Sequence, residues 1–163
     1  MTRTSVILFV DELGLEAGEL LRQAALRLMR GDRDVRIIHA EEIQLPPLPL
    51  EVRTKPVAAL DDRCRVTAVV EAFATGAEAV AIIGTSALDV PVDFVDLAFD
   101  NLSGVRALSI GPSNESIYLV AMNDLFPDII ALAASEKRFD DLLSRALDAG
   151  SVAIMPKWPP NNV

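Results

Sequence analysis

The chain has 163 residues, of which 51% are hydrophobic and 24% charged, so it is long and apolar enough to fold as one domain rather than stay disordered. Its net charge of −9 argues against binding to nucleic acid or to an anionic membrane, and favours an acidic cytoplasmic protein. The single cysteine, Cys64, excludes an internal disulfide, and its place in a predicted helix favours a small core residue over a nucleophile.

The N-terminal part of the chain predicts a β-α-β unit. An apolar, β-branched run at 5–10 is typical of a buried strand, and it is too short for a signal-peptide core or a membrane span. A turn at 11–14 leads into an amphipathic helix at 15–30, and a second strand follows at 35–40. Such a unit favours two parallel strands joined by a right-handed crossover.

The next segment, 43–58, contains four prolines, so we expect a surface loop with at most an edge strand. A helix is predicted at 61–77, with Val66, Val69, Val70 and Phe73 on its apolar side. Its charged start, residues 61–65, is interpreted as a solvated face carrying Asp61, Asp62, Arg63 and Arg65. The strand at 80–84 is apolar on both faces, which predicts the centre of the sheet.

The second half continues the alternation of helices and strands. The predicted elements are a helix at 92–102, strands at 105–110 and 117–122, helices at 124–135 and 138–149, and a short strand at 152–155. We therefore predict a single three-layer α/β/α domain over 1–158 with a mostly parallel, Rossmann-like sheet. Residues 159–163 are expected to form an irregular tail, because Pro159 and Pro160 stop strand pairing, and Trp158 is expected to cover apolar surface or meet a partner.

Common catalytic and phosphate-binding signatures are absent from the sequence. It contains no G-x-G-x-x-G, no P-loop and no G-x-S-x-G elbow. The one histidine, His39, lies at the end of a predicted strand, where a structural role is more common than a catalytic one. With one cysteine and one histidine no zinc-ligand spacing arises, so we predict no metal-binding residues.

Three neighbouring segments carry a family resemblance: 60–80, IIGTSALDVP at 82–91 and SIGPSNESIYLVAM at 109–122. In order and spacing they resemble a bacterial family of small glycosyltransferase-like proteins with a GT-A-type nucleotide-diphospho-sugar transferase fold. The resemblance covers about residues 60–158. It implies a GT-A-like fold and a nucleotide or nucleotide-sugar as ligand.

The resemblance also implies a ligand site above the carboxyl ends of the strands. It would comprise Gly84, Thr85, Ser86, Asp89, Gly111, Pro112, Glu115 and Tyr118. Two of these residues have a structural alternative. Asp89 could cap the helix that follows it, and Tyr118 could be a half-buried core residue whose hydroxyl reaches a partner.

The chain departs from the family pattern at positions where the family has charged residues. Ser86 stands in place of an aspartate that would hold a divalent cation, the basic loop after the first strand is missing, and the acidic motif after Trp158 is replaced by prolines. We therefore expect a binding or regulatory protein that lacks metal-dependent catalysis, with no cofactor and no assigned catalytic residue. The alternatives are an active transferase holding Mg²⁺ or Mn²⁺ on Asp89 and Glu115, or an unrelated Rossmann-like interaction module. A homodimer is the default expectation for oligomeric state.

Overall fold

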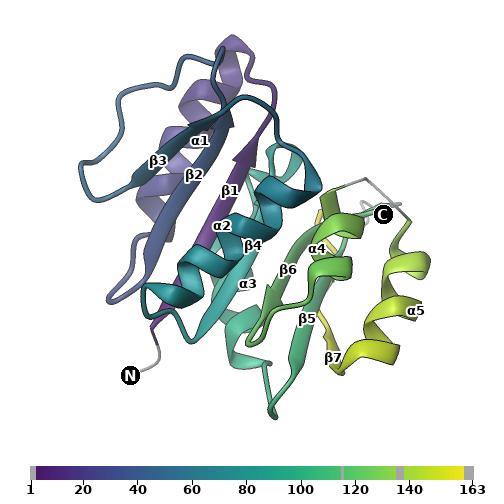
Figure 1. Ribbon diagram of the computed structural model, residues 1–163. Helices are drawn as coiled ribbons and strands as arrows, with labels where there is room; N and C mark the ends of the chain where they lie inside the picture. The colour runs from purple at the N-terminus through teal and green to yellow at the C-terminus, as the bar shows by residue number, and fades with distance from the viewer. Residues whose placement is uncertain (1–2, 115, 135–137, 160–163) are drawn as a thin grey trace.

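The computed structural model describes residues 3–114, 116–134 and 138–159, which form a seven-stranded sheet covered by helices (Figure 1). The strands are β1 (Thr4–Val10), β2 (Asp34–Ala40), β3 (Arg53–Val57), β4 (Ala79–Gly84), β5 (Ala107–Pro112), β6 (Ile117–Met122) and β7 (Ser151–Ile154). The helices are α1 (Leu15–Leu28), α2 (Asp62–Ala74), the 3-10 turn η1 (Thr85–Ala87), α3 (Val92–Asp100), α4 (Pro127–Ala134) and α5 (Phe139–Ala149).

The sheet has the strand order β3-β2-β1-β4-β6-β5-β7. Only β6 runs antiparallel to its neighbours β4 and β5, and the other pairs are parallel. The prediction of a mostly parallel sheet is confirmed. The prediction that the strand at 80–84 lies at the centre is also confirmed, because β4 is the middle strand and Ala79–Ile83 are all buried.

Two apolar layers fill the space on either side of the sheet. Alternate residues of β1 supply both, since side chains of a strand point to opposite faces. Val6 and Leu8 pack with α1 and α3, whereas Ile7 and Phe9 pack with α2, α4 and α5. Figure 1 shows the same division, with α2, α4 and α5 in front of the sheet and α1 and α3 behind it. The three-layer prediction is confirmed.

The proline-rich segment 43–58 contains the edge strand β3, which pairs with β2 alone. Pro56 is tolerated there because an edge strand does not need every N–H in the ladder. Helix α2 ends at Ala74, before the predicted residue 77, because Gly76 takes a positive φ of 112° that ends the helix. Val70 is 43% exposed rather than part of the apolar face.

The C-terminal segment after β7 continues along the end of β5. Trp158 donates its backbone N–H to the Pro112 carbonyl at 3.0 Å, and its ring meets the Phe94 ring edge-on at a centroid distance of 5.4 Å. The expectation that Trp158 covers apolar surface is confirmed, while a partner contact stays a prediction. Residues 160–163 of the predicted tail lie outside the described residues. Among the described helices, none combines the length and apolarity needed to cross a bilayer.

Candidate functional site

The order of the strands reverses between β1 and β4. From β1 the chain passes through α1 to β2 on one side, and from β4 it passes through α3 to β5 on the other. The two strands are parallel neighbours, with Phe9 opposite Gly84 in the register, so their carboxyl ends open at the same edge of the sheet. A crevice at such a switch point is where open α/β sheets bind ligands.

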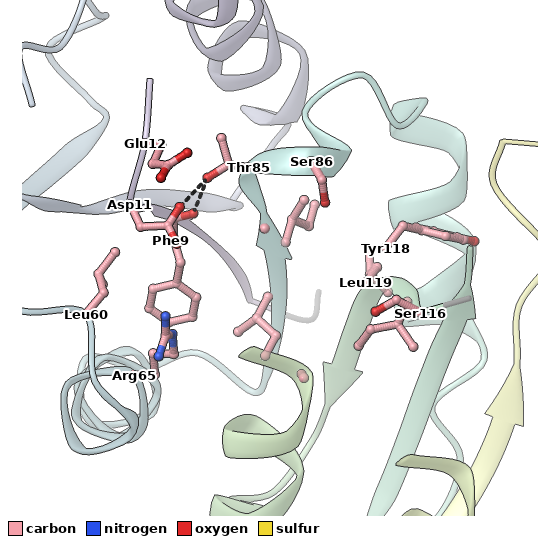
Figure 2. Close-up of a pocket in the computed structure, with 15 residues that line it drawn as sticks. Phe9, Asp11, Glu12, Leu60, Arg65, Thr85, Ser86, Ser116, Tyr118 and Leu119 are labelled. Carbon is pink, nitrogen blue, oxygen red and sulfur yellow. Dashed lines mark hydrogen bonds between the residues drawn. The ribbon is translucent and has the colours of Figure 1, made fainter. Parts of the chain in front are cut away.

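A cleft of about 450 Å³ lies at this switch point (Figure 2). Its wall is assembled from the ends of β1 and β4, the start of β6, and side chains of α2 and α4. This volume falls in the range of small-ligand sites in proteins. The cleft is therefore the candidate ligand site of the chain.

Thr85 joins the two strands at the rim of the cleft. Its hydroxyl oxygen lies 3.1 Å from the carbonyl oxygen of Phe9 and 3.4 Å from Oδ1 of Asp11, so its proton is donated toward these two acceptors (Figure 2). The hydrogen bond fixes the turn after β4 against the end of β1. Ser86, the next residue, is exposed at the same rim.

The charged side chains of the cleft come from segments that the sequence analysis did not select. Asp11 and Glu12 follow β1 directly, and both line the cleft beside Thr85 (Figure 2). We predicted these positions only as part of a turn. Their place after a buried strand next to the central strand is the signal that identifies them, because polar residues at carboxyl strand ends face the crevice.

Arg65 corrects the interpretation of residues 61–65 as a solvated face. Its side chain is only 14% exposed, lines the cleft, and sets its guanidinium 5.9 Å from the centre of the Phe9 ring. Cation–π attraction and a 3.8 Å contact with Asp62 hold the side chain there. Asp61 is the N-cap of α2, since its carboxylate accepts the backbone N–H of Cys64 at 2.8 Å.

Only some of the eight predicted site residues lie in the cleft. Gly84, Thr85, Ser86 and Tyr118 line the cleft, whereas Asp89, Gly111 and Pro112 do not, and Glu115 lies outside the described residues.

Tyr118 satisfies the structural alternative. It is 3% exposed, and its hydroxyl donates to the Pro156 carbonyl at 2.7 Å. Figure 2 shows this hydroxyl pointing away from Asp11 and Thr85, although part of the ring lines the cleft. Burial raises the pKa of Tyr118 to about 12. Gly111 lies under the ring, where a Cβ atom would collide with it, so the glycine serves this packing.

Asp89 lies outside the cleft, and it does not cap the helix that follows it. The cap interpretation is wrong, because α3 begins after Pro91 as its N-cap, with no side-chain cap. The carboxylate is exposed and is not part of the cleft. The alternative cation site on Asp89 and Glu115 stays a prediction, because Glu115 lies outside the described residues. Asp93 lies in the first turn of α3, where the helix dipole favours a negatively charged side chain.

The surroundings of His39 and Cys64 fit the structural roles that the sequence favours for them. His39 is buried in β2 and donates from Nδ1 to the Ala40 carbonyl at 2.9 Å. Cys64 is half-buried, and burial, followed by the nearby Asp61 charge, raises the pKa of its thiol, which disfavours the nucleophilic thiolate. Neither side chain lines the cleft.

The cleft offers a limited set of donors for a divalent cation. Over the described part of the chain, no group of three or more His, Cys, Asp or Glu side chains gathers in a way that could hold a metal ion. The side-chain oxygen donors of the cleft include the carboxylates of Asp11 and Glu12 and the hydroxyls of Thr85, Ser86 and Ser116. Such a set fits Mg²⁺ or Mn²⁺ only if phosphate oxygens and water complete the coordination, as is common for Mg²⁺.

Comparisons with known proteins agree on the fold. No protein-family model matches the chain, and no curated protein matches it. A candidate nucleotide-diphospho-sugar transferase from Desulfovibrio desulfuricans G20 superposes with a TM-score of 0.71 at 22% identity, covering 97% of this chain and 81% of its own. The chain therefore has the GT-A-like fold of nucleotide-diphospho-sugar transferases.

Nucleotidyltransferase structures resemble the chain as well. A nucleotidyl transferase from Methanothermobacter thermautotrophicus gives a TM-score of 0.62 at 13% identity, with 98% of this chain and 89% of that one covered. The 4-diphosphocytidyl-2C-methyl-D-erythritol synthase from Anaerococcus prevotii DSM 20548 gives a TM-score of 0.59 at 12% identity. The match covers 99% of this chain and 90% of that one. Both likenesses concern the fold, which these enzyme classes share with this chain.

Proposed function

We propose that the protein binds a nucleotide or nucleotide-sugar in the cleft between β1 and β4, and that it acts as a binding or regulatory protein without metal-dependent transfer. The observation that carries this proposal is the switch-point cleft itself, lined by the predicted turn Gly84–Ser86. Its volume of about 450 Å³ suits a ligand of this size. The fold shared with nucleotide-diphospho-sugar transferases supports the class of ligand.

The charges of the cleft support binding over transfer. A transferase must stabilise the charge that develops on the leaving diphosphate, usually with a cation and basic groups. Ser86 supplies a neutral hydroxyl where the family resemblance implies a metal-holding carboxylate. Among the described residues that line the cleft, Arg65 is the one basic side chain. We therefore assign Arg65 to the phosphate of the ligand, because a guanidinium pairs well with phosphate oxygens.

Isothermal titration of the protein with UDP, CDP, GDP, dTDP and their sugars tests the proposal. For the nucleotide that binds, Arg65→Gln should weaken the affinity roughly tenfold, the loss expected for one charge-assisted hydrogen bond. Arg63→Gln is the matched control, since Arg63 is exposed on the same helix and does not line the cleft. No saturable binding by any of these ligands, or equal losses in both variants, would contradict the proposal.

An active transferase is a second candidate, favoured by the two carboxylates beside Thr85. In this case Asp11 and Glu12 would hold Mg²⁺ or Mn²⁺, and the cation would neutralise the diphosphate. Nucleotide binding would then be lost in a chelator and in Asp11→Asn. Under the binding proposal the chelator leaves the affinity of the native chain unchanged.

A gain-of-function variant separates the two candidates further. Ser86→Asp restores a carboxylate at the rim, and the exposed position should accept it. If the native cleft binds nucleotide without metal, this variant should acquire Mg²⁺-dependent tightening that the native chain lacks. Ser144→Asp, at an exposed position of α5, adds the same charge away from the cleft and should acquire none. Equal metal dependence in the native chain and in Ser86→Asp would favour the transferase.

A further inference from the structure

A basin of about 520 Å³ lies at the opposite end of the sheet from the cleft, at the amino ends of β1 and β2 and beside the loop after α2. The amino ends of β1 and β2 lie toward the bottom of Figure 1, whereas their carboxyl ends lie toward the top. Four arginines and three acids line the basin: Arg3, Arg33, Arg36, Arg53, Asp32, Asp34 and Glu51. With Asp96, which pairs with Arg33 from outside this lining, four acids balance the four arginines, in a chain whose net charge is −9.

The arginines of the basin are built into the fold. The Arg33 and Arg36 side chains are only 9% and 10% exposed. Arg36 donates to both Asp34 and the Thr75 hydroxyl, which fixes its guanidinium between β2 and the end of α2. The Arg3 guanidinium lies over Gly76, at a distance that leaves no room for a Cβ atom. The Arg33 and Arg36 side chains are therefore held in place before any ligand arrives.

Two carboxylates at this end of the sheet each pair with two arginines. Asp34 is shared by Arg36 and Arg53, the latter at 3.5 Å. Asp96 is likewise shared by Arg33 at 2.7 Å and Arg30 at 2.8 Å. Two carboxylates thus serve four guanidinium groups.

One donor in this cluster is buried without a partner. Nε of Arg33 donates to the Thr4 hydroxyl at 3.3 Å and Nη2 donates to Asp96, but Nη1 has no acceptor among the described residues. A buried guanidinium N–H is strongly driven to find an acceptor, because it has lost its hydrogen bonds to water. The cluster therefore has a free donor that an anion would satisfy, and the exposed guanidinium groups of Arg3 and Arg53 line the same basin.

From this arrangement we propose that the amino-end basin is a second ligand site that binds a phosphate group, either inorganic phosphate or a phosphomonoester. A tetrahedral phosphate presents several oxygens to guanidinium groups that converge from different directions. The site needs no metal ion, since the protein supplies the positive charge. It is independent of the nucleotide cleft, because no residue lines both.

The proposal is tested by titrating the full chain with inorganic phosphate at constant ionic strength, with chloride as the balancing salt, and following backbone amides by NMR. Saturable shifts are expected for amides at 31–36, at Arg53 and at 75–77. Shifts that stay linear in phosphate, or that appear at 84–86 instead, would overturn the proposal. A parallel titration with glycerol phosphate separates the two sources: tighter binding than phosphate indicates an organic ligand, and equal binding indicates the free ion.

Substitution variants test whether phosphate binds in the basin or only screens the charge of the protein surface. Arg53→Gln should weaken phosphate binding roughly tenfold, and its fold should be unaffected because the Arg53 side chain is 64% exposed. Arg3→Gln provides a second exposed variant with the same expectation. Arg145→Gln removes the same charge from an exposed position of α5 and should bind phosphate as the native chain does. An equal loss in Arg145→Gln, or no loss in both basin variants, would overturn the proposal.

Discussion

The two ends of the central sheet differ in charge. The cleft at the carboxyl end sets the two carboxylates of Asp11 and Glu12 against the one arginine, Arg65, whereas the basin at the amino end sets four arginines against three acids. The fold alone places the ligand site at the carboxyl end. Under our two proposals, the carboxyl end would hold a diphosphate with modest help from the protein, and the amino end would take a phosphate group. Position in the fold and local charge therefore carry separate information about ligands.

The largest expected effect concerns the packing that supports the carboxyl end. Gly111→Val would force a side chain into the Tyr118 ring, so we expect a loss of about 3 kcal/mol in the free energy of unfolding. Chemical denaturation measures it. Gly14→Val is the control, because a Cβ at Gly14 meets no atom within 4 Å and its φ is negative. If both variants were equally stable, the close contact between Gly111 and Tyr118 would not be a feature of the folded protein.

At the amino end, the buried and exposed members of one ion-pair cluster can be compared directly. Arg33→Met removes a nearly buried guanidinium from Asp96 and Thr4, and we expect a loss of about 2 kcal/mol of stability. Arg30→Met removes an arginine that is 54% exposed from the same Asp96 and should cost about 0.5 kcal/mol or less. Thermal or urea unfolding distinguishes them. Similar losses would mean that the burial of Arg33 does not increase its contribution to stability over that of Arg30.

The titration of the Tyr118 hydroxyl tests whether this side chain is buried beside the cleft. Its folded pKa is raised to about 12, above the unfolded value near 10, so the folded state favours the protonated phenol. The corresponding stability is fully present below about pH 10 and is lost as the pH rises toward 12, by about 1–2 kcal/mol. Because Tyr118 is the only tyrosine, tyrosinate absorbance reports its titration alone. Tyr118→Phe should lack this pH-dependent loss, and a native titration near pH 10 would contradict burial of the hydroxyl.

The smallest expected effect concerns the start of α2, the helix that carries Arg65 to the cleft. Asp61→Ala removes the N-cap hydrogen bond to Cys64 and should cost about 1 kcal/mol of stability. Asp62→Ala removes a carboxylate that is 67% exposed, and its effect should be close to zero. Equal effects in urea unfolding would show that Asp61 does not cap the helix.

The sequence predicts the parts of the structure that depend on local pattern. The apolar run at 79–84 identifies the central strand, and the turn that follows supplies three residues of the cleft. Strand and helix periodicity is a local property, so these elements could be assigned without knowledge of their neighbours. The family resemblance, rather than periodicity, selects the cleft residues of the turn that follows this strand.

The residues that were missed depend on which strands become neighbours. Asp11 and Glu12 look like an ordinary turn until β1 is placed beside β4, and Arg65 looks solvated until Phe9 lies under its guanidinium. Asp89 does not cap α3, because Val90 and Pro91 lie between it and the first helical residue, Val92. Such contacts are set by tertiary packing, which a single sequence does not display.

Amide-resolved NMR with a nucleoside diphosphate, recorded with and without Mg²⁺, tests the central claim most directly. We predict saturable shifts at Asp11–Glu12 and Gly84–Ser86 that persist without the metal, while amides at 31–36 in the basin stay unchanged. Shifts confined to the basin, or no saturable shift at either end of the sheet, would contradict the assignment of the cleft as the nucleotide site.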